Sequence, residues 1–410
     1  VAGTLNLASN FTPAAATSFA VLNYATRTGG FTTITGRDLV PTRGAGMSLD
    51  TAWSGTALNL IARGQILFHG DSGGGLSRGI FRVLGDATGR TPITPEYSLT
   101  GHGQPRWSPD YKWVTYGGNV SSGNNFLHIA TPNGGTVYHV VNDISTRRAR
   151  FSPSGAHIAA ECGATYGDVC VVTGVASPSD GQGDGAGKIL VTQSVNPLLT
   201  GAGVFAWNPT DPDQLAVVRD TTVNATRTSA IYTVNYDGTG VTRIAVLPEG
   251  STVEGTIDWS PDGTLLAFST VDPSFVTTLY TIAVGPRTLT QIGTADDRWP
   301  VFSPDGGEIL FLNGYDSCAA NYYAMRPDGT GRRQLTNDDM CDFTVDDLGH
   351  DWSPDGGWIV VMAVNQPPPS GTNPDAIFIA PSTVNPTTYA SQRILVRGGF
   401  VRDIQPSWRP

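Results

Sequence analysis

The sequence contains no long uninterrupted apolar run. A helix needs about 18 apolar residues or more to cross a bilayer, and no stretch approaches this length, so we expect no membrane span. Long helices are not predicted either, because Pro, Gly and β-branched residues interrupt every candidate segment. The 50 Gly and 28 Pro residues are spread evenly, which is typical of many short strands and turns.

Lysine and glutamate are scarce. Lysine is found only at positions 112 and 188, so nearly all positive charge is arginine, which binds carboxylates with better geometry than lysine. Codon bias in the genome would produce the same composition. Glutamate is found only at positions 96, 161, 249, 254 and 308. Ordinary glycoside hydrolysis uses paired carboxylates that often include Glu, so a hydrolase is less favoured. The net charge of −10 argues against nucleic acid as a partner.

Only four cysteines are present, enough for two disulfides. Glycosylation sequons begin at Asn10, Asn119 and Asn224. The chain starts at Val rather than Met, and we expect either a processed mature chain or a trimmed piece. Together these features predict a secreted, glycosylated protein, which we expect to be a monomer.

One five-residue element recurs along the chain. It reads Trp259-Ser260-Pro261-Asp262-Gly263 and is followed at once by an apolar run. Pro and Gly suit a tight turn, because Pro presets φ and Gly allows positive φ. Intervals between the aromatic residues run from 43 residues (259 to 302) to 56 residues (352 to 408), the period of a four-stranded propeller blade. The other copies begin at Trp107, Phe151, Trp207, Phe302, Trp352 and, incompletely, Trp408.

We therefore predict an all-β, seven-bladed β-propeller of four-stranded antiparallel blades over residues 65–410. In each unit the strand after the turn is predicted to be the inner strand, and the next aromatic is predicted to end the fourth strand. Residues 1–64 carry no full repeat, and we expect an N-terminal extension that adds strands or a cap to a single-domain chain. Within it, residues 19–24 and 31–35 are predicted to pair, and Trp53 is predicted to end an outer strand.

The cysteine positions agree with this strand assignment. Cys162 ends the first strand of the third unit and Cys170 opens its second, so a hairpin would place them side by side. Cys318 and Cys341 follow the first and third strands of the sixth unit, and those two loops emerge on one face of a blade. We predict both disulfides.

The repeated Trp-Ser-Pro-Asp-Gly element with its apolar strand resembles the WD40-like, TolB-type β-propeller repeat. The resemblance covers about residues 65–410. Two units depart from it: Ser154 stands where Asp is usual, and Asp211-Pro212 is inserted in the fourth unit. These departures weaken the turn locally.

A propeller gathers one set of loops from every blade around a central funnel, where distant residues can meet. We place His69, His102 and His350 on this face. Arg106 and Arg150 share the position one residue before the aromatic, and together they would form a local anion site. In the alternative interpretation each arginine pairs with a neighbouring Asp. Further candidates for substrate binding are Arg148, Arg219, Arg298 and Tyr315.

An acidic loop raises the question of a metal. Carboxylate oxygens are ligands that Ca²⁺ prefers, so Ca²⁺ or another divalent cation is a candidate cofactor of the central funnel. No EF-hand spacing is present, and a solvated acidic loop held by Cys341 would give the same pattern. The loop contains Asp338, Asp339, Asp342, Asp346 and Asp347.

The candidate residues favour a polysaccharide lyase. β-Elimination beside a uronate carboxylate needs a group that neutralises the carboxylate, a base and an acid. Arg150 would neutralise the carboxylate, and His69 and His102 would transfer protons. The layout resembles that of oligogalacturonate lyases, and in size and blade count the chain is similar to fungal lyases that release terminal rhamnose from glucuronic acid. The expected partner is an acidic oligo- or polysaccharide. A quinone-dependent sugar dehydrogenase and a non-catalytic, TolB-like protein- or glycan-binding propeller stay open as alternatives.

Overall fold

The fold consists almost entirely of β-strands. The computed structural model describes residues 3–8, 13–39, 46–71, 78–94, 104–118, 126–135, 137–141, 146–162, 167–173, 188–190, 201–224, 226–314, 320–337, 349–363, 376–396 and 406–408. Within these ranges one α-helix, α3 (Tyr389–Gln392), spans only four residues. No helix of the described part is long and apolar enough to span a bilayer. The predicted all-β class is confirmed.

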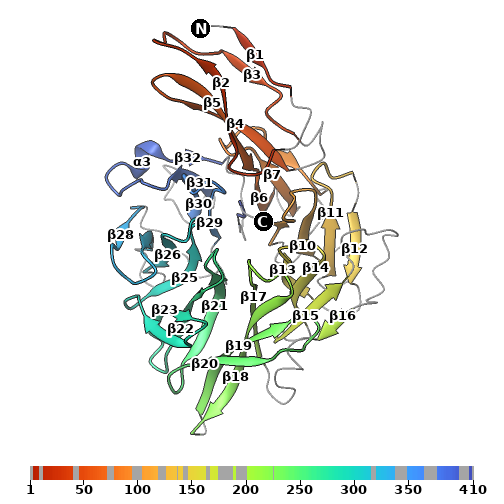
Figure 1. Cartoon of the computed structure of the whole chain (residues 1–410), viewed down its shortest axis with the longest axis vertical. Coiled ribbons are helices and arrows are strands. Elements are labelled where there is room, and N and C mark those ends of the chain that lie inside the picture. The colour runs from red at the N-terminus through yellow and green to blue at the C-terminus, as the bar shows by residue number, and fades with distance from the viewer. Residues whose placement is uncertain are drawn as a thin grey trace.

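Antiparallel sheets follow one another along the chain and surround a common centre (Figure 1). Among the described residues, six of these sheets have four strands, and β6 (Ile66–Asp71), β7 (Arg78–Val83) and β8 (Thr91–Pro92) form one with three. The four-stranded sheets are β9 (Arg106–Trp107), β10 (Val114–Gly118), β11 (Phe126–Ala130) and β12 (Val137–Val141); β13 (Thr146–Phe151), β14 (His157–Cys162), β15 (Asp168–Thr173) and β16 (Lys188–Leu190); β17 (Gly201–Trp207), β18 (Gln214–Val223), β19 (Thr226–Asn235) and β20 (Thr242–Val246); β21 (Thr252–Trp259), β22 (Leu265–Val271), β23 (Thr277–Ala283) and β24 (Thr288–Gln291); β25 (Asp297–Phe302), β26 (Ile309–Asn313), β27 (Asn321–Met325) and β28 (Arg333–Gln334); β29 (His350–Trp352), β30 (Trp358–Ala363), β31 (Ala376–Pro381) and β32 (Ile394–Leu395).

The strand that ends in the repeated aromatic belongs to the same sheet as the strand after the turn. Trp259 pairs with Leu266, and Phe302 pairs with Ile309. The prediction that the aromatic ends the fourth strand of the preceding unit is therefore wrong. A turn of so few residues joins its two flanking strands as an antiparallel hairpin, so the sheet boundary lies elsewhere. The aromatic strand is the edge strand nearest the centre of the ring, as for β13, β17 and β21 in Figure 1.

Hydrogen bonds explain why the turn recurs. Ser260 Oγ donates to Asp262 Oδ1 (2.6 Å) and accepts from the N–H of Leu265 (2.9 Å). The N–H of Gly263 donates to the Ser260 carbonyl (2.8 Å) at a φ of 68°, a value that favours glycine. In the copy that begins at Phe151, Ser154 replaces the aspartate, and its Oγ lies 3.0 Å from Ser152 Oγ. The turn therefore keeps its shape there without the carboxylate.

Indole nitrogens join consecutive sheets. Trp207 Nε1 donates to the carbonyl of Arg150 (3.1 Å), and Trp259 Nε1 donates to the carbonyl of Ala206 (3.2 Å). Trp352 Nε1 donates in the same way to Val301 (3.1 Å). Each acceptor is the residue directly before the aromatic of the preceding sheet, which we call the pre-aromatic position. The bonds fix the backbone at that position.

The C-terminal end of the described chain meets the first sheet of the ring. Leu67 and Ser407 exchange two backbone hydrogen bonds of 2.9 and 3.0 Å, and Trp408 Nε1 donates to the carbonyl of Gly64 (2.7 Å). The C-terminal segment thus pairs with β6, near the centre of Figure 1.

The N-terminal extension forms its own small sheets and packs on the first two sheets of the ring. β1 (Thr4–Asn6) pairs in parallel with β3 (Thr33–Thr35). β2 (Ser18–Asn23) pairs with β5 (Ala57–Gly64), which also pairs with β4 (Met47–Trp53). The predicted pairing of residues 19–24 with 31–35 is wrong, because Phe19 pairs with Leu60 instead; Trp53 does end a strand.

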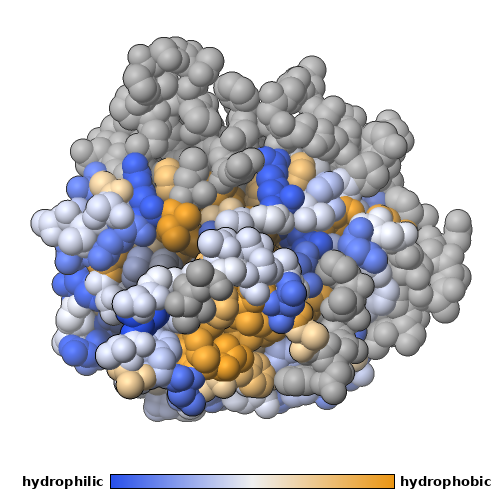
Figure 2. Space-filling model, turned by 90° about the horizontal axis from the view of Figure 1, so that it is seen from above, coloured by the Kyte–Doolittle hydropathy of each residue, from blue (hydrophilic) through white to orange (hydrophobic). Residues whose placement is uncertain are grey.

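The extension and the ring share one hydrophobic cluster. Met47 and Leu49 of β4 pack in it with Leu67, Trp107 and Tyr111. A charged contact adds to it, because Arg63 Nη2 lies 2.7 Å from Asp355 Oδ2 in the last complete turn. Figure 2 views the molecule from the top of Figure 1, where the extension lies. On this face hydrophobic residues are flanked by hydrophilic ones.

One of the two predicted disulfides is confirmed. Cys162 and Cys170 are bonded across the β14–β15 hairpin, with their Cα atoms 5.9 Å apart. Cys318 and Cys341 lie outside the described residues. That second pairing stays a prediction.

Candidate functional site

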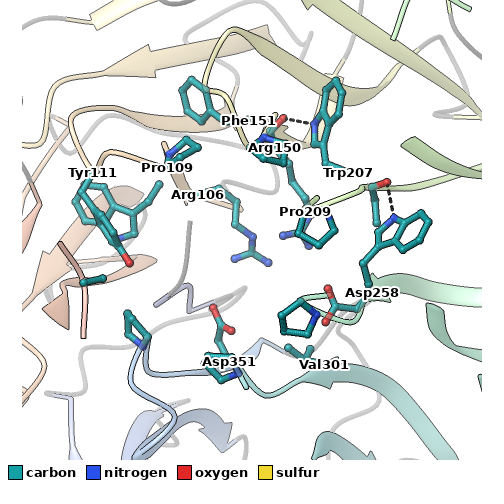
Figure 3. Close-up of a pocket in the computed structure, with 18 of the residues that line it drawn as sticks. Arg106, Pro109, Tyr111, Arg150, Phe151, Trp207, Pro209, Asp258, Val301 and Asp351 are labelled. Atoms are coloured by element: carbon teal, nitrogen blue, oxygen red, sulfur yellow. Dashed lines mark hydrogen bonds between the residues drawn. The ribbon is translucent and has the colours of Figure 1, made fainter. Parts of the chain in front are cut away.

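A pocket of about 840 Å³ lies at the centre, where the repeated turns of successive sheets meet (Figure 3). It is lined by the proline of every complete turn. Because proline lacks an N–H and has a fixed φ, these residues form a rigid apolar collar. The collar consists of Pro109, Pro153, Pro209, Pro261, Pro304 and Pro354.

The side chains at the pre-aromatic position also line this central pocket. Their identities follow the chain as Arg, Arg, Ala, Asp, Val and Asp. The indole hydrogen bonds hold the backbone at three of these positions, those of Arg150, Ala206 and Val301, and so fix where their side chains begin. The residues are Arg106, Arg150, Ala206, Asp258, Val301 and Asp351.

Two arginines reach into the pocket from neighbouring sheets. Arg106 lies in β9 and Arg150 in β13, two strands that contact each other. Both side chains are partly buried, and Figure 3 shows them extending toward the middle of the pocket. The structure therefore brings together the pair that the sequence placed at one shared position. Guanidinium groups in this arrangement can bind a carboxylate or another oxyanion.

Two aspartates face them from the other side of the pocket (Figure 3). Asp258 Oδ2 accepts the backbone N–H of Phe302 (2.8 Å), and Asp351 Oδ2 accepts that of Trp408 (3.0 Å). In both cases the donor is the aromatic of the next sheet. Sequence analysis missed these aspartates, although they share the position of the arginines.

His350 lines the pocket as well and is buried. Its Nε2 lies 2.7 Å from the carbonyl oxygen of Trp299, and its ring lies edge-on to Tyr322 with the ring centroids 5.1 Å apart. Because a carbonyl only accepts, Nε2 carries the proton, and in the neutral ring Nδ1 is then the nitrogen that can accept one. The prediction placed His350 near the funnel, and the structure places it at the pocket wall.

Of the other predicted residues, those that the structure describes do not line this pocket. His69 is fully buried in β6, opposite Ile80. His102 and Tyr315 lie outside the described residues. The structure therefore does not bring His69 together with Arg150, and the roles predicted for His69 and His102 stay predictions.

Three predicted arginines form ion pairs away from the pocket. Arg148 Nη1 lies 2.6 Å from Glu161 Oε1, Arg219 Nη1 lies 3.2 Å from Asp168 Oδ1, and Arg298 Nη1 lies 2.6 Å from Glu254 Oε1. These partners differ from the adjacent aspartates that the sequence suggested. Burial lowers the pKa of the Arg219 guanidinium, and Asp168 offsets part of this effect.

The extension completes one wall of the pocket. Pro13, Ala14 and Ala15 line it together with Met47. Lys112 and Asp110 lie at the mouth and form an exposed ion pair of 3.0 Å, which is weak in water. The lining of the pocket therefore combines apolar residues with charged ones.

The described residues hold no group of three or more His, Cys, Asp or Glu side chains that would bind a metal ion. The acidic loop 338–347 lies outside them, so the predicted cation is not tested. Among the sequons, Asn224 is exposed and donates through Nδ2 to Glu249 Oε2 (2.9 Å), while Asn10 and Asn119 lie outside the described residues.

Comparison with known proteins identifies the fold. No protein-family model matches the chain. No curated protein matches it either. A puromycin hydrolase complexed with PGG is similar in structure at 13% identity and a TM-score of 0.54, over 92% of this chain and 57% of that one. An oligogalacturonate lyase in complex with manganese is similar at 11% identity and a TM-score of 0.51, over 86% of this chain and 95% of that one.

The chain has a β-propeller fold. At these identities the likeness shows the fold alone. TolB from Acinetobacter baumannii is similar over 84% of this chain and 66% of that one, at 13% identity and a TM-score of 0.48. The propeller predicted from the repeats is thus confirmed, and its number of blades stays a prediction.

Proposed function

We propose that this protein is a secreted, monomeric propeller lyase that binds a uronic acid residue in the central pocket and cleaves the adjoining glycosidic bond by β-elimination. A terminal rhamnose–glucuronate linkage is the specific substrate proposed. In this account the ring has seven blades, and the pairing of the C-terminal segment with β6 completes the first of them. The observation that carries the proposal is the entry of Arg106 and Arg150 into one pocket from neighbouring sheets.

The pocket chemistry supports an acidic sugar. The two guanidinium groups can hold the carboxylate by charge-assisted hydrogen bonds. Apolar rings of the proline collar offer flat surfaces that a pyranose ring can contact. Neutralising the carboxylate makes the neighbouring C5 proton more acidic, which is the first requirement of elimination.

The elimination balances within the substrate. A base takes the C5 proton, the electron pair forms the C4–C5 double bond, and the C4–oxygen bond breaks as the leaving oxygen receives a proton. His350 is the imidazole that lines the pocket, and its Nδ1 is our candidate proton acceptor. His102, which lies outside the described residues, is retained as a proton carrier predicted from the sequence, whereas His69 is buried in β6 and does not line the pocket.

A second function is favoured by one observation. Asp258, Asp351 and His350 all make hydrogen bonds to backbone groups of neighbouring sheets, so these polar side chains of the pocket also hold the ring together. A pocket of this kind suits binding without turnover. The alternative is therefore a glycan-binding propeller that uses the same two arginines.

The test is incubation of the full chain with pectin, ulvan and rhamnose-capped arabinogalactan, followed by ultraviolet absorbance of unsaturated uronate. The lyase proposal predicts absorbance with at least one substrate and a loss of about 100-fold or more in Arg150→Ala. Arg243→Ala, an exposed arginine of β20, is the matched control and should keep its rate. Saturable binding without absorbance would support the binding function, and full activity in a folded Arg106→Ala, Arg150→Ala double variant would overturn both.

A further inference from the structure

The charges of the central pocket are divided between its two sides. Along the chain the pre-aromatic position supplies Arg106 and Arg150 first and Asp258 and Asp351 later, with Ala206 and Val301 in between. Because consecutive sheets follow one another around the centre, this order places cations on one side and carboxylates on the other (Figure 3). A ligand that fills the pocket therefore meets acceptors opposite the guanidinium groups.

We propose that Asp258 and Asp351 determine specificity by accepting hydrogen bonds from the hydroxyl groups of the bound sugar acid. The pocket then selects a ligand that carries a carboxylate at one end and hydroxyl donors at the other. This inference rests on the proposed function, since it assumes that the arginine pair holds the carboxylate.

Both carboxylates are held in place before a ligand arrives. Asp258 Oδ2 accepts from Phe302 N (2.8 Å), and Asp351 accepts from Trp408 N through Oδ2 (3.0 Å) and from Trp352 N through Oδ1 (2.9 Å). An ionised carboxylate accepts about four hydrogen bonds, and these backbone bonds orient the group. Side chains that are already oriented lose little conformational entropy when they bind a ligand.

The same arrangement rejects other classes of ligand. A dianion or a dicarboxylate would place negative charge against Asp258 or Asp351, and like charges repel at short range. A neutral sugar would leave the arginine pair without an anionic ligand. An apolar carboxylate would fill the aspartate side with groups that cannot donate, which forfeits hydrogen bonds that a hydroxyl would make.

Three probes separate these possibilities by calorimetric titration of the full chain. Glucuronate carries both features, cyclohexanecarboxylate lacks the hydroxyls, and methyl glucoside lacks the carboxylate. We expect glucuronate to bind at least about tenfold more tightly than either of the others, which corresponds to one or two hydrogen bonds. Cyclohexanecarboxylate binding as tightly as glucuronate would overturn the inference and leave the proposed function standing. Binding by none of the three would count against the proposed function itself.

Two variants test the assignment to the aspartates. Asp258→Asn and Asp351→Asn keep a carbonyl oxygen for the backbone N–H of the next sheet, so both should fold. We expect glucuronate binding to weaken about tenfold while cyclohexanecarboxylate binding stays the same or improves. An equal change for both ligands would overturn the assignment, because a purely structural role would affect them alike. If either variant fails to fold, the comparison of the three probes on the unaltered chain still tests whether the pocket selects a ligand that carries both a carboxylate and hydroxyl groups.

Discussion

The indole Nε1 of Trp259 donates a hydrogen bond of 3.2 Å to the carbonyl oxygen of Ala206. This single contact joins two sheets and fixes the backbone of a residue that lines the central pocket. Where the repeat has Phe302 instead of tryptophan, the Asp258 carboxylate binds its N–H. At each of these two seams a polar contact beside a buried aromatic helps to hold neighbouring sheets together.

Replacing Trp259 by phenylalanine should remove this hydrogen bond and retain most of the apolar packing. Trp259 is buried, so the Ala206 carbonyl loses its donor in a place that water does not easily reach. We expect the free energy of unfolding to fall by about 1–3 kcal/mol. Denaturant titration measures this change. An unchanged midpoint would show that the indole bond does not stabilise the seam.

The turn glycines should differ in their tolerance of alanine. Gly263 has a φ of 68°, and a Cβ there would lie 2.3 Å from Thr210 Oγ1. Gly356 has a similar φ of 67°, but the nearest atom to its Cβ would be 3.7 Å away. We expect Gly356→Ala to cost about 1 kcal/mol from backbone strain, and Gly263→Ala to cost clearly more.

Gly285→Ala is the control for this comparison, because no atom lies within 4 Å of the added Cβ and its φ is not positive. It should leave the melting temperature within the error of the measurement. Equal losses at positions 263 and 356 would contradict the steric part of the explanation.

The ion pair between Arg63 of the extension and Asp355 of the last complete turn should make the stability of the fold depend on pH. Burial would raise the pKa of Asp355, but hydrogen bonds from Arg63 and Ser353 outweigh it and hold the pKa below its usual range. A lowered pKa stabilises the folded state above the pKa of the unfolded chain, about 3.9. This contribution is lost as the pH falls through the lower, folded value.

Asp355→Asn should therefore lower stability by about 2 kcal/mol near pH 7 and by less near pH 3. Chemical denaturation at both pH values measures the difference. Asp328→Asn is the comparison. The exposed carboxylate of Asp328 accepts a hydrogen bond from the Thr330 hydroxyl, and the variant should lose less stability than Asp355→Asn. A loss that is equal at both pH values would show that charge is not the cause.

The disulfide between Cys162 and Cys170 closes a short loop, with a sequence separation of 8. In the chain-entropy account, such a loop contributes about 2.5 kcal/mol by restricting the unfolded chain. The Cys162→Ala, Cys170→Ala double variant should be less stable by about this amount and should still bind its ligand, because neither residue lines the central pocket. Denaturant titration and calorimetric binding check the two parts separately.

The sequence predicted the repeat, the β-propeller and one disulfide because each depends on local chemistry. The turn from Ser260 to Gly263 is closed by its own hydrogen bonds, so the five-residue element that begins at Trp259 suffices to identify it. The sheet boundary was misplaced because the aromatic was assigned to the preceding unit. A tight turn between two apolar strands indicates a hairpin, and this signal was present at Trp259 and Leu266.

The candidate site was predicted only in part, because only some of its residues can be recognised from a local pattern. Arg106 and Arg150 could be found because they share one position in the repeat. Asp258 and Asp351 share it too, but their contacts with the next sheet depend on how the sheets are arranged around the centre, which no local pattern shows. The burial of His69 inside β6 is likewise a property of the packed sheet, and loop position alone did not indicate it.

The most direct test of the central claim is calorimetric titration of glucuronate into the unaltered chain and into Arg106→Ala, Arg150→Ala and their double variant. If the two guanidinium groups hold a carboxylate in the central pocket, each single variant should weaken binding about tenfold or more. The folded double variant should show no measurable binding, and Arg243→Ala should bind as the unaltered chain does. Undiminished binding by the double variant would contradict the account.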